Sequence, residues 1–333
     1  MPDRRSTPGD GAEGTAEVYA GASAEPADRD QTPHVVVVGA ACRDIAADDP
    51  RGWRLGGGAT YSTLTMARLG ARTGAVLGVD GLAAGAAELD VIRDTGASLH
   101  MVDLEHGPVF ENIEQPGGRV QICVATSSRV PAAAVPPAWA AAPVWILAPV
   151  ADEIGDEWAA VPPVDAVVAV AWQGMLRDLL AGERVRRRVP RASALVARAD
   201  IVAASHHDIA PGTEVDELLA MLRPGAHFLL TKGAEGGILW RRGSGGRVTA
   251  RRYPALIPDG VVDATGAGDT FLAALVSTWL VPELARLRDR GGDLRFAAAA
   301  GSLVVEGYGL AGVPDLGAVV RRTRRSIGYP AAG

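Results

Sequence analysis

The chain has few cysteines, a single lysine, no long apolar run and no excess of positive charge. Two cysteines, Cys42 and Cys123, give no disulfide framework and fit a reducing compartment. No apolar run approaches the ~20 residues of a membrane span, and the N-terminus lacks an apolar signal core. A net charge of −6 gives no electrostatic case for binding nucleic acid. We therefore expect a cytoplasmic protein with neither a membrane nor a nucleic-acid partner.

The near absence of lysine has a simple explanation in codon bias, which the abundance of alanine and arginine supports. The one lysine, Lys232, nevertheless stands in Thr231-Lys232-Gly233, directly after an apolar run.

The 333 residues, of which 48% are hydrophobic, suffice for one large α/β domain, expected at 33–330. Short apolar runs alternate with helical segments, which predicts a doubly wound, mostly parallel sheet flanked by helices. We predict strands at 34–39, 73–79, 98–103, 144–147, 164–170, 201–204 and 227–231, then an antiparallel edge at 238–242 and 247–253. We predict helices at 59–69, 82–95, 152–160, 215–222, 270–280, 294–305 and 316–325.

Two segments differ from this pattern. Residues 1–32 have almost no large apolar side chains and cannot offset the entropy of ordering, so a disordered tail is expected. Residues 109–115 and 119–126 flank a Pro-Gly-Gly turn and alternate in character, which predicts a hairpin. We expect it to form a small β lid at about 98–128, the alternative being an ordinary edge hairpin.

The stretch richest in chemistry runs from Asp263 to Asp269 (D-A-T-G-A-G-D), between a short apolar run and an apolar helix. Gly266, Ala267 and Gly268 let a ligand approach the backbone, and the free amides of the helix start attract anions. Phosphate would repel a carboxylate placed there, so Asp269 is a candidate acceptor for the proton of an attacking hydroxyl. A helix start with a capping aspartate is the other interpretation.

The first predicted strand ends at Gly39 without the G-x-G-x-x-G fingerprint of dinucleotide-binding folds. This absence argues against a dinucleotide-dependent oxidoreductase. Asp44 follows the same strand and is either a loop cap or a ligand-binding carboxylate. We favour ligand binding because of its place at the carboxyl end of a strand.

Together these residues resemble the ribokinase-like, or PfkB, family of carbohydrate kinases, from about His34 to the C-terminal helix. D-A-T-G-A-G-D-T-F at 263–271 is similar to the family's second signature. The Gly-Gly pair at 56–57, A-R-L-G at 67–70 and G-V-D-G at 78–81 resemble its first signature in weaker form. The resemblance implies a ribokinase-like fold with a small β lid, ATP and Mg²⁺ as cofactors, and a homodimer formed through the lid.

The resemblance also implies roles for individual positions. Asp269 matches the catalytic base, beside an anion hole for the transferring phosphoryl group. Asp44, Gly56 and Gly57 match residues that bind substrate hydroxyls. Asp263 and Thr265 match positions that coordinate a monovalent cation, K⁺, in cation-activated members. The anion hole corresponds to Gly266, Ala267 and Gly268, and the ATP site to Thr231, Lys232, Gly233, Gly236, Thr265, Gly266 and Gly268.

The chain departs from the family pattern at several positions. Tyr61 replaces a pocket asparagine, and its flat face favours a cyclitol, a pyranose or a nucleobase, unless it only packs beneath the first helix. Asp208, in Ser-His-His-Asp, replaces the glutamate of the magnesium-linked N-x-x-E and keeps oxygen chemistry. The adjacent histidines have no spaced third ligand for a transition metal. Only about 16 residues separate Gly39 from Gly56, so the lid is expected to rest mainly on the later hairpin.

Two further segments, F-E-N with R-V-Q and W-Q-G-M-L-R, resemble a subgroup with unsettled substrates. They contain Asn112, Gln121, Gln173 and Arg177, whose amide and guanidinium groups suit a hydroxyl-rich ligand. Exposed hairpin polarity and a solvated helix residue are the alternatives.

The sequence thus predicts an ATP-dependent kinase that phosphorylates a hydroxyl of a small polyol, a sugar or cyclitol. A nucleoside kinase is an alternative, since Tyr61, Phe110 and Trp172 can stack on a base. A non-catalytic sugar-binding regulator is the alternative from another class, and the intact Asp263 and Asp269 argue against it.

Overall fold

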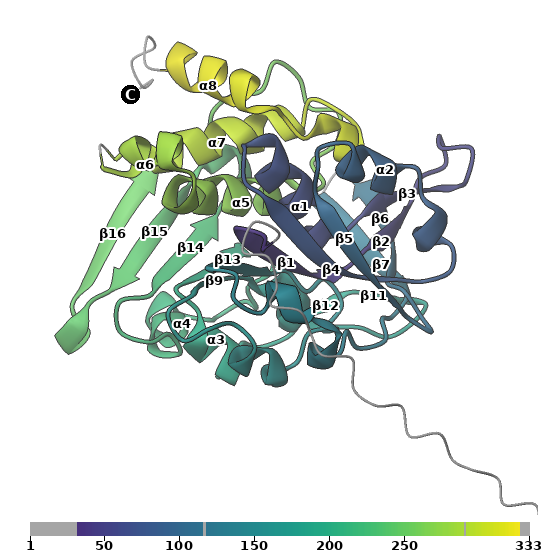
Figure 1. The fold of residues 1–333 in the computed structure, drawn as a ribbon, viewed down its shortest axis with the longest axis horizontal. Coiled ribbons are helices and arrows are strands. Elements are labelled where there is room, and N and C mark those ends of the chain that lie inside the picture. The colour runs from purple at the N-terminus through teal and green to yellow at the C-terminus, as the bar shows by residue number, and fades with distance from the viewer. Residues whose placement is uncertain (1–31, 116–117, 290, 327–333) are drawn as a thin grey trace, which may run out of the picture.

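The structure, a computed structural model, describes residues 32–115, 118–289 and 291–326 (Figure 1). The tail expected at 1–32 lies outside these ranges except for Thr32. A nine-stranded sheet runs through the molecule in the order β16-β15-β14-β13-β9-β8-β1-β4-β5. Its strands are parallel except β15 and β16, which pair antiparallel at one edge. They are β1 (Val35–Ala40), β4 (Thr73–Val79), β5 (Ser98–Asp103), β8 (Val144–Leu147), β9 (Val167–Ala171), β13 (Ile201–Ser205), β14 (His227–Thr231), β15 (Gly237–Arg242) and β16 (Val248–Tyr253).

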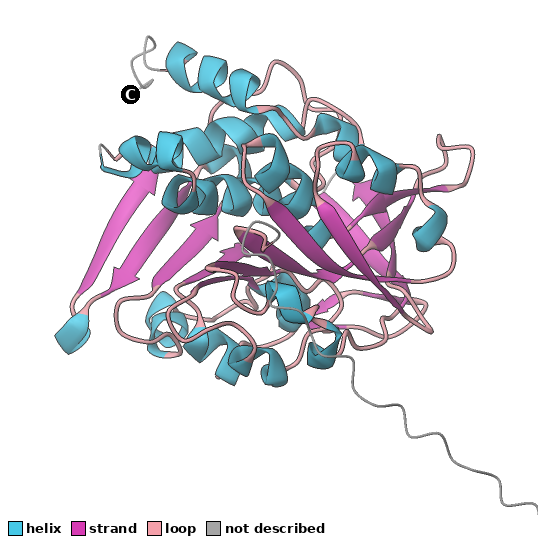
Figure 2. Ribbon diagram, viewed as in Figure 1, coloured by secondary structure: helices cyan, strands magenta, loops and turns pink. Residues whose placement is uncertain are grey.

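The central strands are buried on both faces, as their runs of consecutive apolar residues predict. All six residues of β1 are buried, which is typical of a strand covered by helices on both sides. One apolar layer lies between the sheet and the helices of one face, and a second layer lies on the opposite face (Figure 2). The predicted doubly wound fold is therefore confirmed.

The helices lie in two layers. One layer contains α1 (Gly58–Arg68), α2 (Glu88–Arg93), α5 (Ala267–Leu280), α6 (Pro282–Asp289), α7 (Asp293–Val304) and α8 (Leu316–Arg325), and the other contains α3 (Ala194–Arg198) and α4 (Val215–Ala220). The helix predicted at 82–95 is broken into a 3₁₀ turn and α2, and that at 152–160 is reduced to a 3₁₀ segment, Asp156–Ala160. Sequence reasoning did not anticipate α3 and α6.

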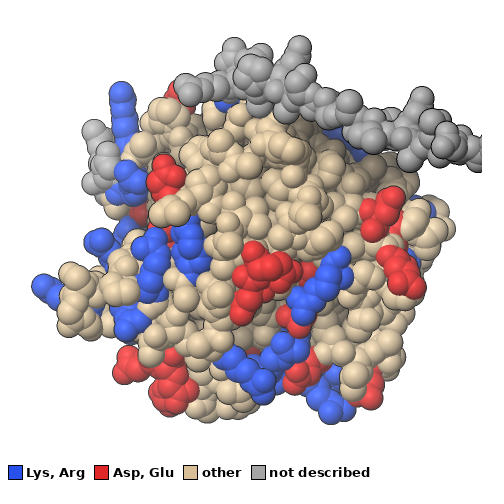
Figure 3. All heavy atoms as spheres, turned by 60° about the horizontal axis from the view of Figure 1, so that its bottom comes forward, with Lys and Arg blue, Asp and Glu red and all other residues tan. Residues whose placement is uncertain are grey.

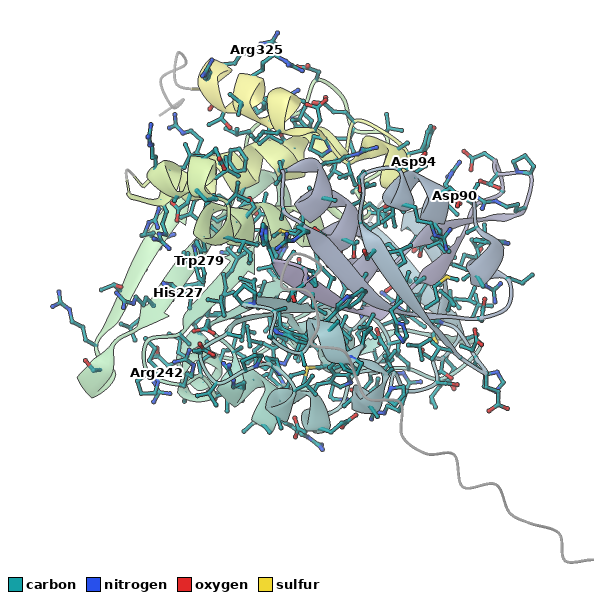
Figure 4. All side chains as sticks on the ribbon, viewed as in Figure 1. Asp90, Asp94, His227, Arg242, Trp279 and Arg325 are labelled. Atoms are coloured by element: carbon teal, nitrogen blue, oxygen red, sulfur yellow. The ribbon has the colours of Figure 1, made fainter. Side chains whose placement is uncertain are left out.

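Helix α5 packs directly against the sheet. Its residues 270–278 are all buried, so this part of the helix is covered around its whole circumference. Figure 4 shows Trp279 of α5 beside His227 of β14, and their ring centroids are 5.5 Å apart. Burial lowers the pKa of His227. This contact belongs to the packing of α5 on β14.

The lid is a separate five-stranded sheet in the order β11-β7-β6-β2-β3. The predicted hairpin is confirmed as β6 and β7. The strand predicted at 98–103 is confirmed as β5, but it belongs to the central sheet, so its inclusion in the lid at about 98–128 was wrong. Besides the hairpin, the lid takes two strands from the short segment after β1. That segment is short and carries charges, so its alternation gave only a weak strand signal. The lid strands are β2 (Cys42–Ile45), β3 (Trp53–Gly56), β6 (Val109–Gln115), β7 (Gly118–Ala125) and β11 (Glu183–Arg184).

Beneath the lid, apolar side chains from β2, β6 and β7 pack against Val150 and Ala151, which follow β8. The lid therefore stands over the carboxyl edge of the central sheet, where α/β folds place their ligands. Two short strands, β10 (Arg177–Asp178) and β12 (Arg186–Arg187), pair antiparallel with each other. In the sequence they lie on either side of β11. On the face shown in Figure 3, arginine and acidic side chains lie close to one another.

Within the described ranges, no single helix has the length and apolar character that a membrane span needs, although the bent pair formed by α5 and Pro282–Arg288 passes that test by length and composition.

Candidate active site

The loop before α5 has a fixed conformation that only glycine suits at its centre. Gly266 has φ 77°, and a Cβ there would lie 2.3 Å from the ring of Tyr61. The carboxylate of Asp263 accepts hydrogen bonds from the amides of Thr265, at 2.9 Å, and Gly309, at 3.3 Å. The loop is thus tied down on one side, and α5 starts at Ala267 directly beyond it. Its first free amides form a site suited to an anion.

Asp269 lies in the first turn of α5 and is partly buried. Burial, reinforced by the charge of Asp208, raises its pKa to about 6, while Arg177 acts in the opposite direction. A Cβ on Gly58 would lie 2.8 Å from Oδ1 of Asp269. Because Gly58 is the first residue of α1, the starts of α1 and α5 meet at this carboxylate. A carboxylate with a pKa near 6 is ionised at neutral pH and is a stronger base than an ordinary aspartate.

Asp44 belongs to a hydrogen-bonded chain on the inner face of the lid. Gln121 Nε2 donates to Asn112 Oδ1 at 2.9 Å, and Asn112 Nδ2 donates to Asp44 Oδ1 at 3.4 Å. The thiol of Cys42 also donates to Asp44 Oδ1, at 3.6 Å. Asn112 and Gln121 face each other across β6 and β7. The structure therefore joins three predicted substrate residues in one polar chain.

Gly56 and Gly57 allow the end of β3 to approach this carboxylate and the end of β1. A Cβ on Gly56 would lie 2.2 Å from Asp44 Oδ2. Gly57 has φ 103°, and a Cβ on it would lie 2.6 Å from the carbonyl oxygen of Ala40. Side chains at either position would displace Asp44 or separate α1 from the sheet.

Gln173, Arg177 and Asp208 converge beside Asp269. Gln173 Nε2 donates to Asp208 Oδ1 at 3.3 Å, and Arg177 Nη2 lies 3.8 Å from the same oxygen. Arg177 is 9% exposed and its guanidinium lies over the ring of Phe110, 5.6 Å from the centroid. Burial lowers its pKa, and the charges of Asp208, Cys42, Asp269 and Asp44 oppose that shift. Arg177 is therefore not a solvated helix residue.

Tyr61 lies between the loop at Gly266 and the end of β3 at Gly56, and it presents no free ring face. It is 1% exposed, and its ring packs against Gly266 on one side and approaches Gly56 on the other. Burial raises the pKa of its hydroxyl well above the usual range, and Asp263, Asp44 and Asp269 reinforce the shift. These contacts favour the other interpretation of Tyr61, in which it packs in the core and does not cover a ligand ring. Tyr61 supports the loop at Gly266 from behind.

The candidate donor loop follows β14. The amide of Lys232 donates to the carbonyl of Gly236 at 2.7 Å, closing a tight turn through Gly233. Gly236 has φ 81°, and a Cβ there would lie 2.1 Å from the carbonyl oxygen of Tyr253. Thr231 ends β14, and its carbonyl accepts from the amide of His206, which follows β13. Four of the predicted ATP residues thus lie in one turn between β14 and β15, beside the loop that follows β13.

The residues do not form a metal site by themselves. Among the described residues, no group of three or more histidine, cysteine or acidic side chains is placed to hold a metal ion. Both oxygens of Asp208 are engaged by protein groups, since Oδ2 accepts from the amide of Ser205 at 3.1 Å. The rings of His206 and His207 pack on each other with centroids 3.8 Å apart. Asp208 and this histidine pair, as the structure places them, therefore do not form a preformed metal site.

Sequence reasoning missed Glu153, a fully buried carboxylate at the same edge. It accepts hydrogen bonds from the amides of Ala40, Val150 and Ala151 at 2.8–3.1 Å. Burial raises its pKa, and these bonds oppose the shift. Glu153 joins the ends of β1 and β8 under the lid. An acidic residue shortly after a buried strand was the available signal, the same one that identified Asp44.

The parallel sheet, the lid and the glycine loop at the start of α5 define a ribokinase-like α/β protein. Residues 183–315 match the family model described as pfkB family carbohydrate kinase. The predicted resemblance to the ribokinase-like, or PfkB, family is thereby confirmed. No curated protein matches the chain by sequence.

Solved structures support the same fold assignment. A ribokinase from Arabidopsis thaliana, complexed with ribose and ATP, is 19% identical with a TM-score of 0.59, covering 88% of this chain and 99% of that one. A nucleoside kinase from Methanocaldococcus jannaschii is 16% identical with a TM-score of 0.63, covering 88% and 98%. A pyrophosphate-dependent kinase of the ribokinase family, complexed with a pyrophosphate analog and myo-inositol, is 16% identical with a TM-score of 0.62, covering 83% and 96%. Similarities at these identities establish the fold.

Proposed function

We propose that the protein is a kinase that transfers a phosphoryl group from ATP to a hydroxyl of a small polyol, a sugar or a cyclitol. The observation that carries the proposal is Asp269, a carboxylate with a raised pKa at the amide-rich start of α5. The fold and the family match agree with this chemistry.

In the proposed reaction, Asp269 accepts the proton of the substrate hydroxyl. The hydroxyl oxygen then forms a bond to the γ-phosphorus, the bond from that phosphorus to the β–γ bridging oxygen breaks, and ADP leaves with that electron pair. The amides at Gly266–Gly268 lie where they can stabilise charge on the transferring group. Positioning and electrostatics supply most of the rate in such transfers.

The donors and acceptors around the site favour an uncharged, hydroxyl-rich acceptor. Asp44 and Asp269 offer acceptors, whereas Arg177 offers donors. Of the aromatic residues that a nucleoside kinase would use, Tyr61 and Trp172 are 1% exposed and Phe110 is 2% exposed. Because none of the three presents a free face, the nucleoside alternative has less support than a sugar or cyclitol.

The decisive experiment is a screen for donor consumption across sugars, cyclitols and nucleosides, with ATP and pyrophosphate as parallel donors. Pyrophosphate is included because one structural neighbour is described as pyrophosphate-dependent. We expect ATP-dependent turnover of one sugar or cyclitol, lost in Asp269→Asn. Binding without turnover of any acceptor would favour the sugar-binding regulator instead.

We also propose K⁺ activation, based on the resemblance of Asp263 and Thr265 to a cation site beside the anion hole. Turnover would be compared in KCl and in a tetramethylammonium salt at matched ionic strength. Higher activity in KCl is expected, and equal rates would remove the ion from the mechanism.

A cytoplasmic location and a homodimer formed through the lid complete the proposal. Light scattering of the purified protein tests the dimer, and a monomer at all concentrations would contradict it.

A further inference from the structure

Asp208 stands where the family pattern places a magnesium-linked carboxylate, yet protein groups already engage its side chain. Oδ2 accepts from the amide of Ser205 at 3.1 Å, and Oδ1 accepts from Gln173 at 3.3 Å. Arg177 Nη2 lies 3.8 Å from Oδ1, and Asp208 is 7% exposed. Mg²⁺ requires near-octahedral oxygen ligands and keeps several waters. A buried carboxylate held by two donors beside a fixed cation is poorly suited to that role.

The guanidinium of Arg177 has donors to spare. Its contacts to described residues are long: a 3.4 Å hydrogen bond from Nη1 to the carbonyl of Val150, and the 3.8 Å approach to Asp208. A guanidinium carries five N–H donors in a planar fork. Burying the guanidinium with so few short hydrogen bonds costs free energy. A ligand that accepts hydrogen bonds from its remaining N–H donors would offset that cost.

The position of Arg177 decides which ligand that is. It lies on the ring of Phe110 in the lid, above the end of β8, and its charge interacts with Asp269 and Asp44 as well as with Asp208. These two carboxylates come from α5 and from the lid. In the proposed function, the acceptor's hydroxyls lie near both carboxylates. The spare donors of Arg177 are therefore placed for the acceptor.

We propose that Asp208 is the counter-ion that positions Arg177, and that Arg177 binds two neighbouring hydroxyl oxygens of the polyol acceptor. The inference rests on the proposed function and narrows its substrate to polyols with adjacent hydroxyls, because a planar fork matches a pair of oxygens better than a single one. In this arrangement Asp208 is a positioning residue, and any metal requirement resides with the donor's phosphates.

The test compares Asp208→Asn, Arg177→Met, Arg177→Lys and the Asp208→Asn/Arg177→Met double variant. Two readouts separate the sides of the site: the Tm increase caused by ATP over a range of MgCl₂, and KM for the acceptor found in the screen. We expect all four variants to keep the Mg·ATP response within about twofold. Acceptor KM should rise about tenfold or more, with no rescue by lysine, and the double variant should resemble Arg177→Met alone because the two residues act together.

A matched control comes from a second Asp–Arg pair, in which the buried Asp293 bonds to the exposed Arg251 and joins α7 to β16. Asp293→Asn should lower Tm while acceptor KM stays at the wild-type value. It therefore separates general loss of stability from loss of acceptor binding.

Asp208→Glu gives a second measurement that does not depend on the folding of the asparagine variant. The family pattern has glutamate at this position, so a metal ligand would tolerate it. A counter-ion would not, because the longer side chain displaces Arg177 and raises acceptor KM.

Three results would overturn the inference: a weakened Mg·ATP response in Asp208→Asn with unchanged acceptor KM, additive effects in the double variant, or wild-type acceptor KM in Asp208→Glu. A wild-type protein that turns over no acceptor contradicts the proposed kinase function. The Mg·ATP response would still decide in that case whether Asp208 holds a metal ion.

Discussion

Two Asp–Arg pairs in this molecule, each with a buried aspartate, differ in how completely they are bonded. Arg251 makes a bidentate contact with Asp293, with Nη1 3.0 Å from Oδ2 and Nη2 on Oδ1, and it also reaches the carbonyl of Gly291 at 3.3 Å. Arg177 only approaches Asp208, at 3.8 Å, although its side chain is 10% exposed against 44% for Arg251. The more buried arginine is thus the less completely bonded one.

The difference separates a structural pair from one to which we assign a functional role. A buried charge is stable when its partner and hydrogen bonds satisfy it, as at the junction of β16 and α7. At the carboxyl edge of the sheet, incomplete bonding leaves donors and acceptors for a ligand. Asp269 lies in the same region. Burial raises its pKa, and no close cationic partner within the described part of the chain offsets that effect.

The largest expected effect is that of Asp269→Asn on turnover. Loss of the base should lower kcat by at least ~10²-fold, the low end of general-base contributions, with little change in nucleotide affinity. Asp293→Asn, which removes a carboxylate from the structural pair with Arg251, should leave kcat unchanged. Steady-state kinetics on the acceptor from the screen measures both. Near-normal turnover in Asp269→Asn would remove Asp269 from the role of base.

Gly266→Ala should damage both folding and turnover. The new Cβ would overlap the buried ring of Tyr61 at 2.3 Å and would hold a positive φ, which together cost about 2–4 kcal/mol. Gly268→Ala is the matched control for stability, since a Cβ there meets no atom within 4 Å. Urea denaturation of both variants measures the difference. Equal stability of the two would show that the loop adjusts more freely than its packing indicates.

Asp293→Asn should lower the free energy of unfolding by about 2 kcal/mol, since it weakens a charged hydrogen-bonded pair that is buried on the aspartate side. Asp208→Asn should cost less, because its contact to Arg177 is long. Denaturant titrations at one pH compare them. A larger loss in Asp208→Asn would contradict the contrast between the two pairs.

The smallest expected effect concerns pH and stability. The pKa of Asp269 is raised from 3.8 to about 6, so its contribution to folding is fully favourable only below about pH 4 and is lost as pH rises through 6. Asp269→Asn should therefore be more stable than wild type at pH 8, by about 1–2 kcal/mol after allowance for partial exposure, and the advantage should vanish near pH 4. Unfolding titrations at pH 4, 6 and 8 test this. A constant difference across that range would show that the carboxylate is not perturbed.

The sequence by itself determined the parallel sheet and the glycine-rich loop before α5. Runs such as Val35–Val38 specify buried strands through local composition, and β4, β5, β8 and β14 lie where the pattern predicted them. A glycine at position 266 indicates a backbone with positive φ, and an aspartate at position 269 indicates a carboxylate at a helix start. Both are local properties of the chain. Local patterning therefore sufficed to identify the candidate base and the candidate anion hole.

Only the tertiary structure decided which distant residues meet. Arg177, Asp208 and Asp269 come from three separate segments. The local sequence pattern of each segment does not indicate that their loops share one edge of the sheet. The surroundings of Tyr61 were also decided by the tertiary structure. Its helical position is compatible with either burial or ligand contact, and only the fold places Gly266 against its ring. Strand order and loop geometry set these contacts, and both depend on the packing of the whole chain.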